Sequence, residues 1–147
     1  LNRISGPFLD RIDLQVNVPK VDLSKTLRGL PSIVEKESSN NQPENSAQVL
    51  KRVIQAQALQ IERQGRLNKA LSTSEIERYC SLTELESVFL AKAMETMQLS
   101  MRAYHRTMRV ARTIADLAGE ARVNQQHLAE ALSFRSFDRM LNELTDL

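Results

Sequence analysis

The chain has 147 residues, of which 41% are hydrophobic and 26% charged, which is enough apolar material for one compact core. Four glycines, four prolines and no tryptophan favour an α-rich domain over a β-sandwich or barrel. The net charge of +2 alone indicates no nucleic-acid partner, the single cysteine excludes an internal disulfide and a cysteine-rich zinc site, and no apolar run approaches the roughly 18 residues of a transmembrane helix.

Residues 1–20 predict a short helix followed by one strand. The chain starts with leucine in what looks like mid-domain sequence, so we expect a fragment of a longer protein, with the cytoplasm as its default location. A helix opens at Gly6–Pro7, where the missing N–H of proline costs little, and continues to about Arg11. Apolar and polar residues alternate from Asp13 to Val18, which predicts a β-strand. Because one strand is not stable alone, we expect its sheet to lie upstream.

Residues 21–46 predict a flexible linker. Their last ten residues, 37–46, read ESSNNQPENS and contain no apolar side chain. Such a segment cannot bury enough apolar surface to offset the entropy of ordering its backbone.

From Ala47 onward the periodicity is helical, and cap residues mark the helix boundaries. The first helix places Val49, Val53, Ala56, Leu59 and Arg63 on one stripe and stops at Gly65. The further boundary signals are Ser72 with Glu75, Thr83 with Glu86, Ser100, Gly119 and Asn124, and residues 137–144 predict a short tail helix. The result is a compact bundle of four or five helices.

The helix from Met101 to Ala118 has two distinct arcs. The apolar arc, about 140° wide, holds Tyr104, Met108, Ala111, Ile114, Ala115, Leu117 and Ala118. The cationic arc, about 120° wide, holds Arg102, His105, Arg106, Arg109 and Arg112, with no acidic residue before Asp116. Guanidinium groups match phosphate oxygens, so this face suits an anionic ligand. A solvated face with surface ion pairs is the alternative interpretation.

A second arginine of interest is Arg11, in the sequence LDRID (Leu9–Asp13). Aspartates at positions 10 and 13 flank it, so one interpretation is a structural ion pair. The other is an arginine presented at a subunit boundary, where it reaches the γ-phosphate held by a neighbour. Such an arginine raises nucleotide hydrolysis rates by roughly 10³–10⁵.

Two long motifs carry a family resemblance. ISGPFLDRIDL followed by NVP, and SMRAYHRTMRVARTIADLAG followed by QQHLAEALSFR, resemble the magnesium-chelatase-like branch of AAA+ ATPases, and within it the ComM family of bacterial proteins linked to natural transformation. The resemblance covers residues 1–18 and about 47–135. It implies that residues 1–20 are the C-terminal end of an ATPase core, 21–46 a linker and 47–147 a helical lid that closes over the nucleotide.

The resemblance also implies roles for two arginines. Arg11 aligns with the family's arginine finger, which acts in trans on the ATP of the next subunit. Arg109 aligns with the sensor 2 arginine of the lid, which contacts the nucleotide of its own subunit; no role is carried over to Arg102, Arg106 or Arg112. The intact protein would use ATP and Mg²⁺ in a hexameric ring that works on DNA, with its own ATPase core and neighbouring subunits as partners and no membrane.

These 147 residues contain neither the phosphate-binding loop GxxxxGK followed by Ser or Thr nor an acidic strand end for Mg²⁺, so we expect no ATP bound and no hydrolysis by them alone. Three alternatives stay open: a magnesium chelatase motor subunit acting on a metal-inserting partner, a free-standing helical module that binds nucleic acid through its arginine face, and an interaction bundle whose residues 1–18 add a strand to a partner sheet. Cys80 is expected to be a half-buried structural thiol, and His105 and His127 to have surface or capping roles without any metal.

Overall fold

The computed structural model describes residues 11–16, 18 and 44–135. Its elements are α3 (Ser46–Gln64), the 3-10 turn η1 (Asn68–Ala70), α4 (Thr73–Tyr79), α5 (Glu84–Thr96), α6 (Met101–Ala118) and α7 (Gln125–Ser133). The predicted mainly helical fold is confirmed. The predicted helix before Arg11, most of the predicted linker and the predicted tail helix at 137–144 lie outside the described residues.

Side-chain caps fix the helix ends where the spacing predicts them. Glu75 accepts a hydrogen bond from the Ser72 N–H at 2.8 Å, and Ser100 Oγ accepts one from the N–H of Ala103 at 3.2 Å. Capping boxes open α3, α4, α5 and α7, at Asn45–Gln48, Ser72–Glu75, Thr83–Glu86 and Asn124–His127. Gly65 and Gly119 end α3 and α6 with φ of 72° and 73°, in the left-handed region that glycine adopts without a Cβ penalty.

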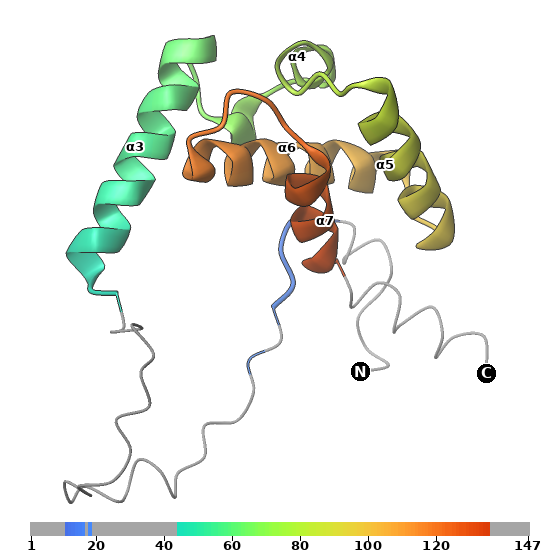
Figure 1. Ribbon diagram of the computed structural model, residues 1–147, viewed down its shortest axis with the longest axis horizontal. Helices are drawn as coiled ribbons and strands as arrows, with labels where there is room; N and C mark the ends of the chain where they lie inside the picture. Colours follow the sequence, from blue (N-terminus) through green and yellow to red (C-terminus); the bar gives the residue numbers. More distant parts are fainter. Residues whose placement is uncertain (1–10, 17, 19–43, 136–147) are drawn as a thin grey trace, which may run out of the picture.

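Helix α6 is the centre of the domain. It runs between α3 and α5, with α4 on one side and α7 crossing on the other (Figure 1). The buried apolar core is formed by Leu71, Ile76, Cys80, Leu90, Met108, Ala111, Ala115, Val123, Leu128, Ala131 and Leu132. Helices α3, α4 and α7 and the turn η1 all contact α6, so this helix sets their relative positions.

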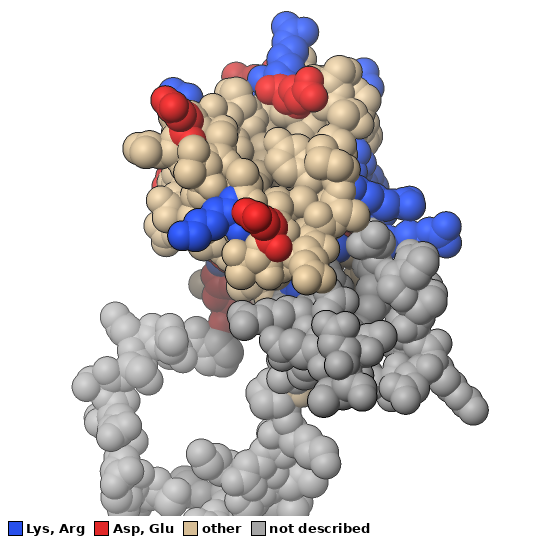
Figure 2. Space-filling view, turned by 90° about the vertical axis from the view of Figure 1, so that its right-hand side faces the viewer, with Lys and Arg blue, Asp and Glu red and all other residues tan. Residues whose placement is uncertain are grey.

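The surface seen from the α5 side is largely uncharged, with separate charged groups and a few basic side chains projecting from one edge (Figure 2). Leu85, Val88 and Met101 are 82%, 63% and 66% exposed. Within the part of the chain that the structure describes, no helix is both long and apolar enough to cross a lipid bilayer.

The buried stripe of α3 differs from the predicted one. Ala56 and Gln60 are buried and Arg63 is half-buried, whereas Leu59 and both predicted valines remain 39% exposed. Gln60 takes the place predicted for Leu59 because its Oε1 accepts a hydrogen bond from the N–H of Asn68 at 2.9 Å. A polar side chain is therefore needed where α3 meets η1.

The buried face of α6 is also more polar than its sequence predicts. Thr107, Arg112 and Asp116 are buried together with the alanines and Met108, whereas Leu117 is 44% exposed and Ala118 is exposed as well. The predicted helix boundaries are confirmed, but the predicted apolar arc was wrong at its C-terminal end. In the last turn of α6, Asp116 faces α3 and forms an ion pair with Arg63.

The predicted strand from Asp13 to Val18 is absent among its described residues. Gln15 N–H donates to the carbonyl of Phe134 at 2.9 Å, just after α7, where Figure 1 shows this segment. A helix end offers isolated carbonyls rather than the ladder that a strand requires. Leu14, Val16 and Val18 are accordingly all at least 50% exposed, so their alternation does not mark a buried sheet face within this structure.

Candidate functional site

Arg109, the predicted sensor 2 residue, lies in the middle of α6 and is half-buried. Its Nε and Nη2 donate to the carbonyl oxygen of Leu71 at 3.2 and 2.7 Å. Leu71 directly follows η1 and is 2% exposed, so this carbonyl is a fixed acceptor. The guanidinium plane is thereby oriented, and neither bond uses Nη1. Two N–H groups at this position therefore point away from the Leu71 contact and are chemically suited to an anion.

Arg112 differs completely from Arg109, although both were predicted on one cationic face. Arg112 is 1% exposed, and its Nε and Nη2 donate to Asp116 Oδ1 at 3.1 and 2.9 Å. Its Nη1 and Nη2 also reach the carbonyls of Ala121 and Glu120 at 2.9 and 2.6 Å. The predicted cationic face was therefore wrong at Arg112, because the first acidic residue of the segment, one turn further along, draws this arginine into the core.

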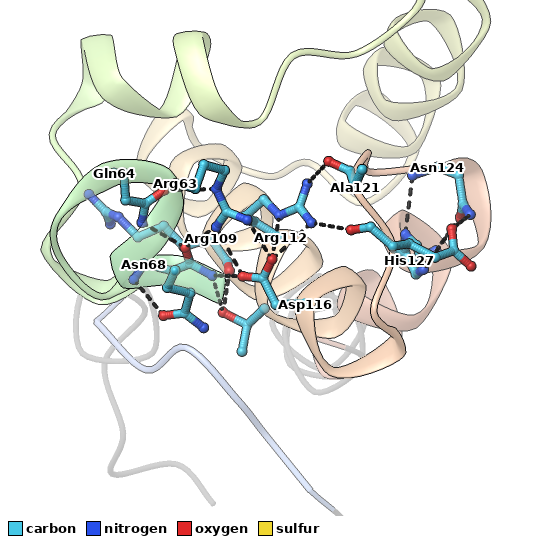
Figure 3. A network of polar contacts seen from close by, with 12 residues as sticks. Arg63, Gln64, Asn68, Arg109, Arg112, Asp116, Ala121, Asn124 and His127 are labelled. Carbon is cyan, nitrogen blue, oxygen red and sulfur yellow. Dashed lines mark hydrogen bonds and ion pairs between the residues drawn. The ribbon is translucent and has the colours of Figure 1, made fainter. Parts of the chain in front are cut away.

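Asp116 is the centre of a buried polar network that joins α3, η1 and α6 (Figure 3). Arg63 of α3 forms a bidentate pair with it, through Nη1 at 2.6 Å and Nη2 at 3.0 Å. Asn68 of η1 donates to Asp116 Oδ2 at 2.8 Å and to Thr113 Oγ1 at 3.0 Å. Every oxygen of this carboxylate is thus hydrogen-bonded, which is the condition under which a buried ion pair is tolerated.

The electrostatics of Asp116 follow from these contacts. Burial works to raise the pKa of the Asp116 carboxyl, but hydrogen bonds from Arg63 and Asn68 and the charges of Arg112 and Arg63 outweigh it, so the pKa lies below its ordinary value. Asp116 is therefore ionised at neutral pH. It neutralises buried guanidinium charge and is not available as a proton donor or acceptor for chemistry.

Arg106, one turn before Arg109, contacts the segment that carries Arg11. Its Nη1 donates to the carbonyl oxygen of Arg11 at 2.6 Å and forms an ion pair with Asp13. The side chain of Arg106 is 18% exposed, and Arg11, the predicted finger, is exposed. The structure therefore brings the Arg11 segment and α6 together through Arg106. Arg102, in the first turn of α6, remains exposed.

Sequence reasoning missed this network because its members are far apart along the chain. Arg63 and Asp116 are 53 residues apart, and Asn68 lies in η1, a three-residue turn that the periodicity did not reveal. The spacing of Arg112 and Asp116, four residues apart on one helix, was the one local signal.

The remaining candidates have structural roles. Cys80 is a structural thiol as predicted, but at 1% exposed it is fully buried rather than half-buried, and this burial raises the pKa of the thiol to about 11. His127 is 4% exposed, and its Nδ1 accepts from the N–H of Asn124 at 3.2 Å, which confirms its capping role. Among residues 11–16, 18 and 44–135, no three His, Cys, Asp or Glu side chains are grouped closely enough to hold a metal ion.

Comparisons with known proteins agree with this architecture. The family described as magnesium chelatase, subunit ChlI C-terminal, matches residues 43–135. All 147 residues align with Competence protein ComM of Haemophilus influenzae at 43% identity and with the uncharacterized protein YifB of Salmonella typhimurium at 42%. YifB of Escherichia coli is 40% identical over 150 aligned residues. In each case the alignment covers 100% of this chain and 27% of the relative, so the chain spans about a quarter of their length.

Proposed function

The chain belongs to the family of magnesium chelatase subunit ChlI C-terminal domains, and on that premise we propose that it is the helical lid of a ring-forming, ComM-like AAA+ ATPase. The observation that carries the proposal is the setting of Arg109. In the described domain this arginine is half-buried, and the carbonyl oxygen of Leu71 orients it by accepting hydrogen bonds from Nε and Nη2. Neither of these two hydrogen bonds involves Nη1. Arg112 cannot take this part, because its donors are committed to Asp116 and two carbonyls.

The described residues fit one edge of a nucleotide site. Arg109 offers donors to a phosphate oxygen, and a guanidinium in a partly desolvated position stabilises the negative charge that develops during hydrolysis. The sequence has no glycine-rich phosphate loop, so the phosphates and Mg²⁺ would be held by residues of the intact protein that this sequence does not contain. Bound ATP would supply the phosphoryl group, and Mg²⁺ would neutralise its oxygens. Arg109, on the lid, would donate hydrogen bonds to the phosphate oxygens of the ATP and so orient them.

Arg11 completes the proposal as an arginine that acts on a neighbour. It is exposed, as a residue that reaches another subunit must be, and it is the central residue of the LDRID motif that suggested this role. In a closed ring the contact between subunits is heterologous, so one subunit's Arg11 faces the next subunit's Arg109. The ring, proposed as hexameric, would thus build each hydrolysis site from two chains.

Arg109→Ala in the intact protein tests the lid role. We expect ATP turnover to fall at least about tenfold, which corresponds to roughly 1.4 kcal/mol of lost transition-state stabilisation. The matched control is Arg102→Ala, which removes an exposed arginine from the same helix and should leave turnover within about twofold. Near-normal turnover for Arg109→Ala, with circular dichroism showing a folded lid, would contradict the role.

Mixing two inactive variants tests the trans role of Arg11. A ring of Arg11→Ala subunits and a ring of Arg109→Ala subunits should each be slow. A random 1:1 mixture places the two intact arginines together at about a quarter of the heterologous interfaces, so activity should return. If Arg11→Ala alone retains full turnover, Arg11 is a structural residue and the finger role is wrong.

Work on DNA is the part of the proposal that rests on the relatives. The name Competence protein ComM associates that relative with competence, so we propose DNA processing during natural transformation for the parent of this chain, which would act in the cytoplasm. The experiment is ATP turnover of the intact protein with and without single-stranded and forked DNA, at several salt concentrations. Turnover that ignores every DNA would favour a motor that acts on a protein partner, as in the magnesium chelatase alternative.

The free-standing nucleic-acid-binding alternative loses its main support in this structure. It needs an open face of arginines on α6, but Arg112 is buried and Arg106 is paired with Asp13. Only part of the predicted positive face therefore remains exposed to solvent in the described domain.

A further inference from the structure

Arg106 joins two segments that lie far apart in the sequence. Its Nη1 donates to the main-chain carbonyl of Arg11, 95 residues away, at 2.6 Å, and pairs with the carboxylate of Asp13. Close by in sequence, the N–H of Gln15 donates to the carbonyl of Phe134 after α7. The segment 11–16 is thus fixed to the helical domain at two points, one on α6 and one at the end of α7.

The contact with Arg106 differs from an ordinary surface pair. Asp13 is 59% exposed, and an exposed pair alone contributes little. However, Arg106 is only 18% exposed and also binds the carbonyl of Arg11 itself. A hydrogen bond to that carbonyl fixes the backbone from which the Arg11 side chain extends. Arg106 therefore acts on the location of Arg11 rather than on its charge.

Arg106 also lies next to Arg109 on the same helix. Residues three apart on an α-helix are neighbours on its surface, and α6 is continuous from Met101 to Ala118. A rigid helix thus carries, one turn apart, the arginine proposed to contact the subunit's own nucleotide and the arginine that holds the Arg11 segment. Any movement of α6 that follows Arg109 also moves the anchor of Arg11.

From this geometry we infer that Arg106 is a positioning residue that couples the lid helix α6 to Arg11, so that the nucleotide state of one subunit sets the placement of the finger in the next subunit's site. The inference rests on the proposed function and deepens it. Arg106 touches no substrate. It acts through the main chain of Arg11, and Asp13 keeps its guanidinium aimed at that chain.

The test uses the intact protein with Arg106→Gln, and with Arg102→Gln as the matched control on the same helix. We expect Arg106→Gln to lower kcat for ATP at least about tenfold with little change in KM, because a displaced group loses its effect on the transition state. Arg106→Lys, which keeps a positive donor, should recover part of kcat. In the Arg11→Ala background, Arg106→Gln should cause no further loss, since it acts through Arg11.

Mixed rings separate positioning from a damaged lid. If Arg106 positions the finger, Arg106→Gln subunits behave like Arg11→Ala subunits and regain activity when mixed with Arg109→Ala subunits. If Arg106→Gln only disturbs the lid, the defect lies in the same site as Arg109→Ala and the mixture stays inactive, which overturns the inference. Unchanged kcat for Arg106→Gln, while Arg11→Ala is slow, also overturns it and leaves the proposed function intact. Unchanged kcat for Arg11→Ala instead refutes the proposed finger and this inference together.

Discussion

Asp116→Asn should destabilise the helical domain by about 3 kcal/mol. The substitution keeps the volume but removes the charge that faces Arg112, and both side chains of this pair are 1% exposed. Removing one partner of a buried ion pair typically costs 3–5 kcal/mol, because an uncompensated charge remains in the interior. Arg112 keeps its bonds to the carbonyls of Ala121 and Glu120, which places the loss near the lower end of that range. Arg63 is 23% exposed and can turn toward water, so it adds less.

The assay is urea unfolding of the 147-residue chain, followed by far-UV circular dichroism at pH 7. The matched control is Glu44→Gln, which removes an ion pair with Arg52 whose two side chains are 49% and 53% exposed and should cost less than about 1 kcal/mol. A loss of 3 kcal/mol lowers Tm by roughly 12 °C or more in a domain of this size. If Asp116→Asn costs no more than Glu44→Gln, the network around Asp116 is not the buried charge balance described above.

The stability lost in Asp116→Asn should depend on pH, in a direction that follows from the pKa of Asp116. Burial acts to raise the pKa of Asp116, but the hydrogen bonds from Arg63 and Asn68 and the charge of Arg112 hold it below the unfolded value of about 3.9. A carboxyl with a lowered pKa contributes stability above its unfolded pKa and loses that contribution as the pH falls through its folded pKa. The difference between the wild type and Asp116→Asn should therefore be full from pH 5 to 7 and shrink below about pH 4.

Three further predictions concern single local features. Gly119→Ala should lower the free energy of unfolding in urea by about 1 kcal/mol, because Gly119 has a φ of 73°, although nothing lies within 4 Å of the added Cβ. Gly119→Asn should lower it by less, and equal losses for both variants would contradict the conformational reason. Asn45→Ala should remove the capping box of α3 and cost about 1 kcal/mol, measured as a fall in Tm, and an unchanged Tm would show that α3 frays there already. Cys80 should react with Ellman's reagent at least about 100-fold more slowly in the native than in the urea-unfolded chain, because burial raises the pKa of its thiol to about 11, and fast native labelling would contradict this burial.

Helix ends were predictable because their determinants are local. The Ser72–Glu75 pair needs only its own first turn to form, and Gly119 needs only the freedom to adopt positive φ. The turn η1 was not predictable in this way, since Leu67 before it offers no side-chain cap and its three residues give no period. Its position depends on Asn68, which contacts α3 and α6 at the same time.

The predictions that were wrong share one cause: the burial of a side chain is decided by partners that are distant in the sequence. Nothing near Leu59 indicates that Gln60 will face the interior instead, because the reason is a main-chain N–H eight residues later. The strand prediction at Asp13–Val18 failed in the opposite sense: the alternation is real, but the described domain supplies no strand edge for it. A periodic sequence pattern shows that the two faces of a helix or strand differ in polarity. The element that packs against it determines which face is buried.

The arginines of α6 show how a single period can serve three different purposes. Arg106, Arg109 and Arg112 follow each other at steps of three, and each step turns about −60° around the helix axis, so the set fans over about 120°. That fan is too wide for one surface, and each member meets a different neighbour: Arg106 meets the segment of Arg11, Arg109 the carbonyl of Leu71, and Arg112 the buried Asp116. Asp116, which Arg112 neutralises from within the same helix, also binds Arg63 of α3 and Asn68 of η1, so α6 is held rigidly against these two elements. A rigid α6 is what the coupling between Arg106 and Arg109 requires, since a helix that flexed between them would move one arginine without the other. Loss of the Asp116 network should therefore weaken that coupling before it unfolds the lid, which would appear in the intact protein as reduced cooperativity of ATP turnover in Asp116→Asn at temperatures where the lid is still folded.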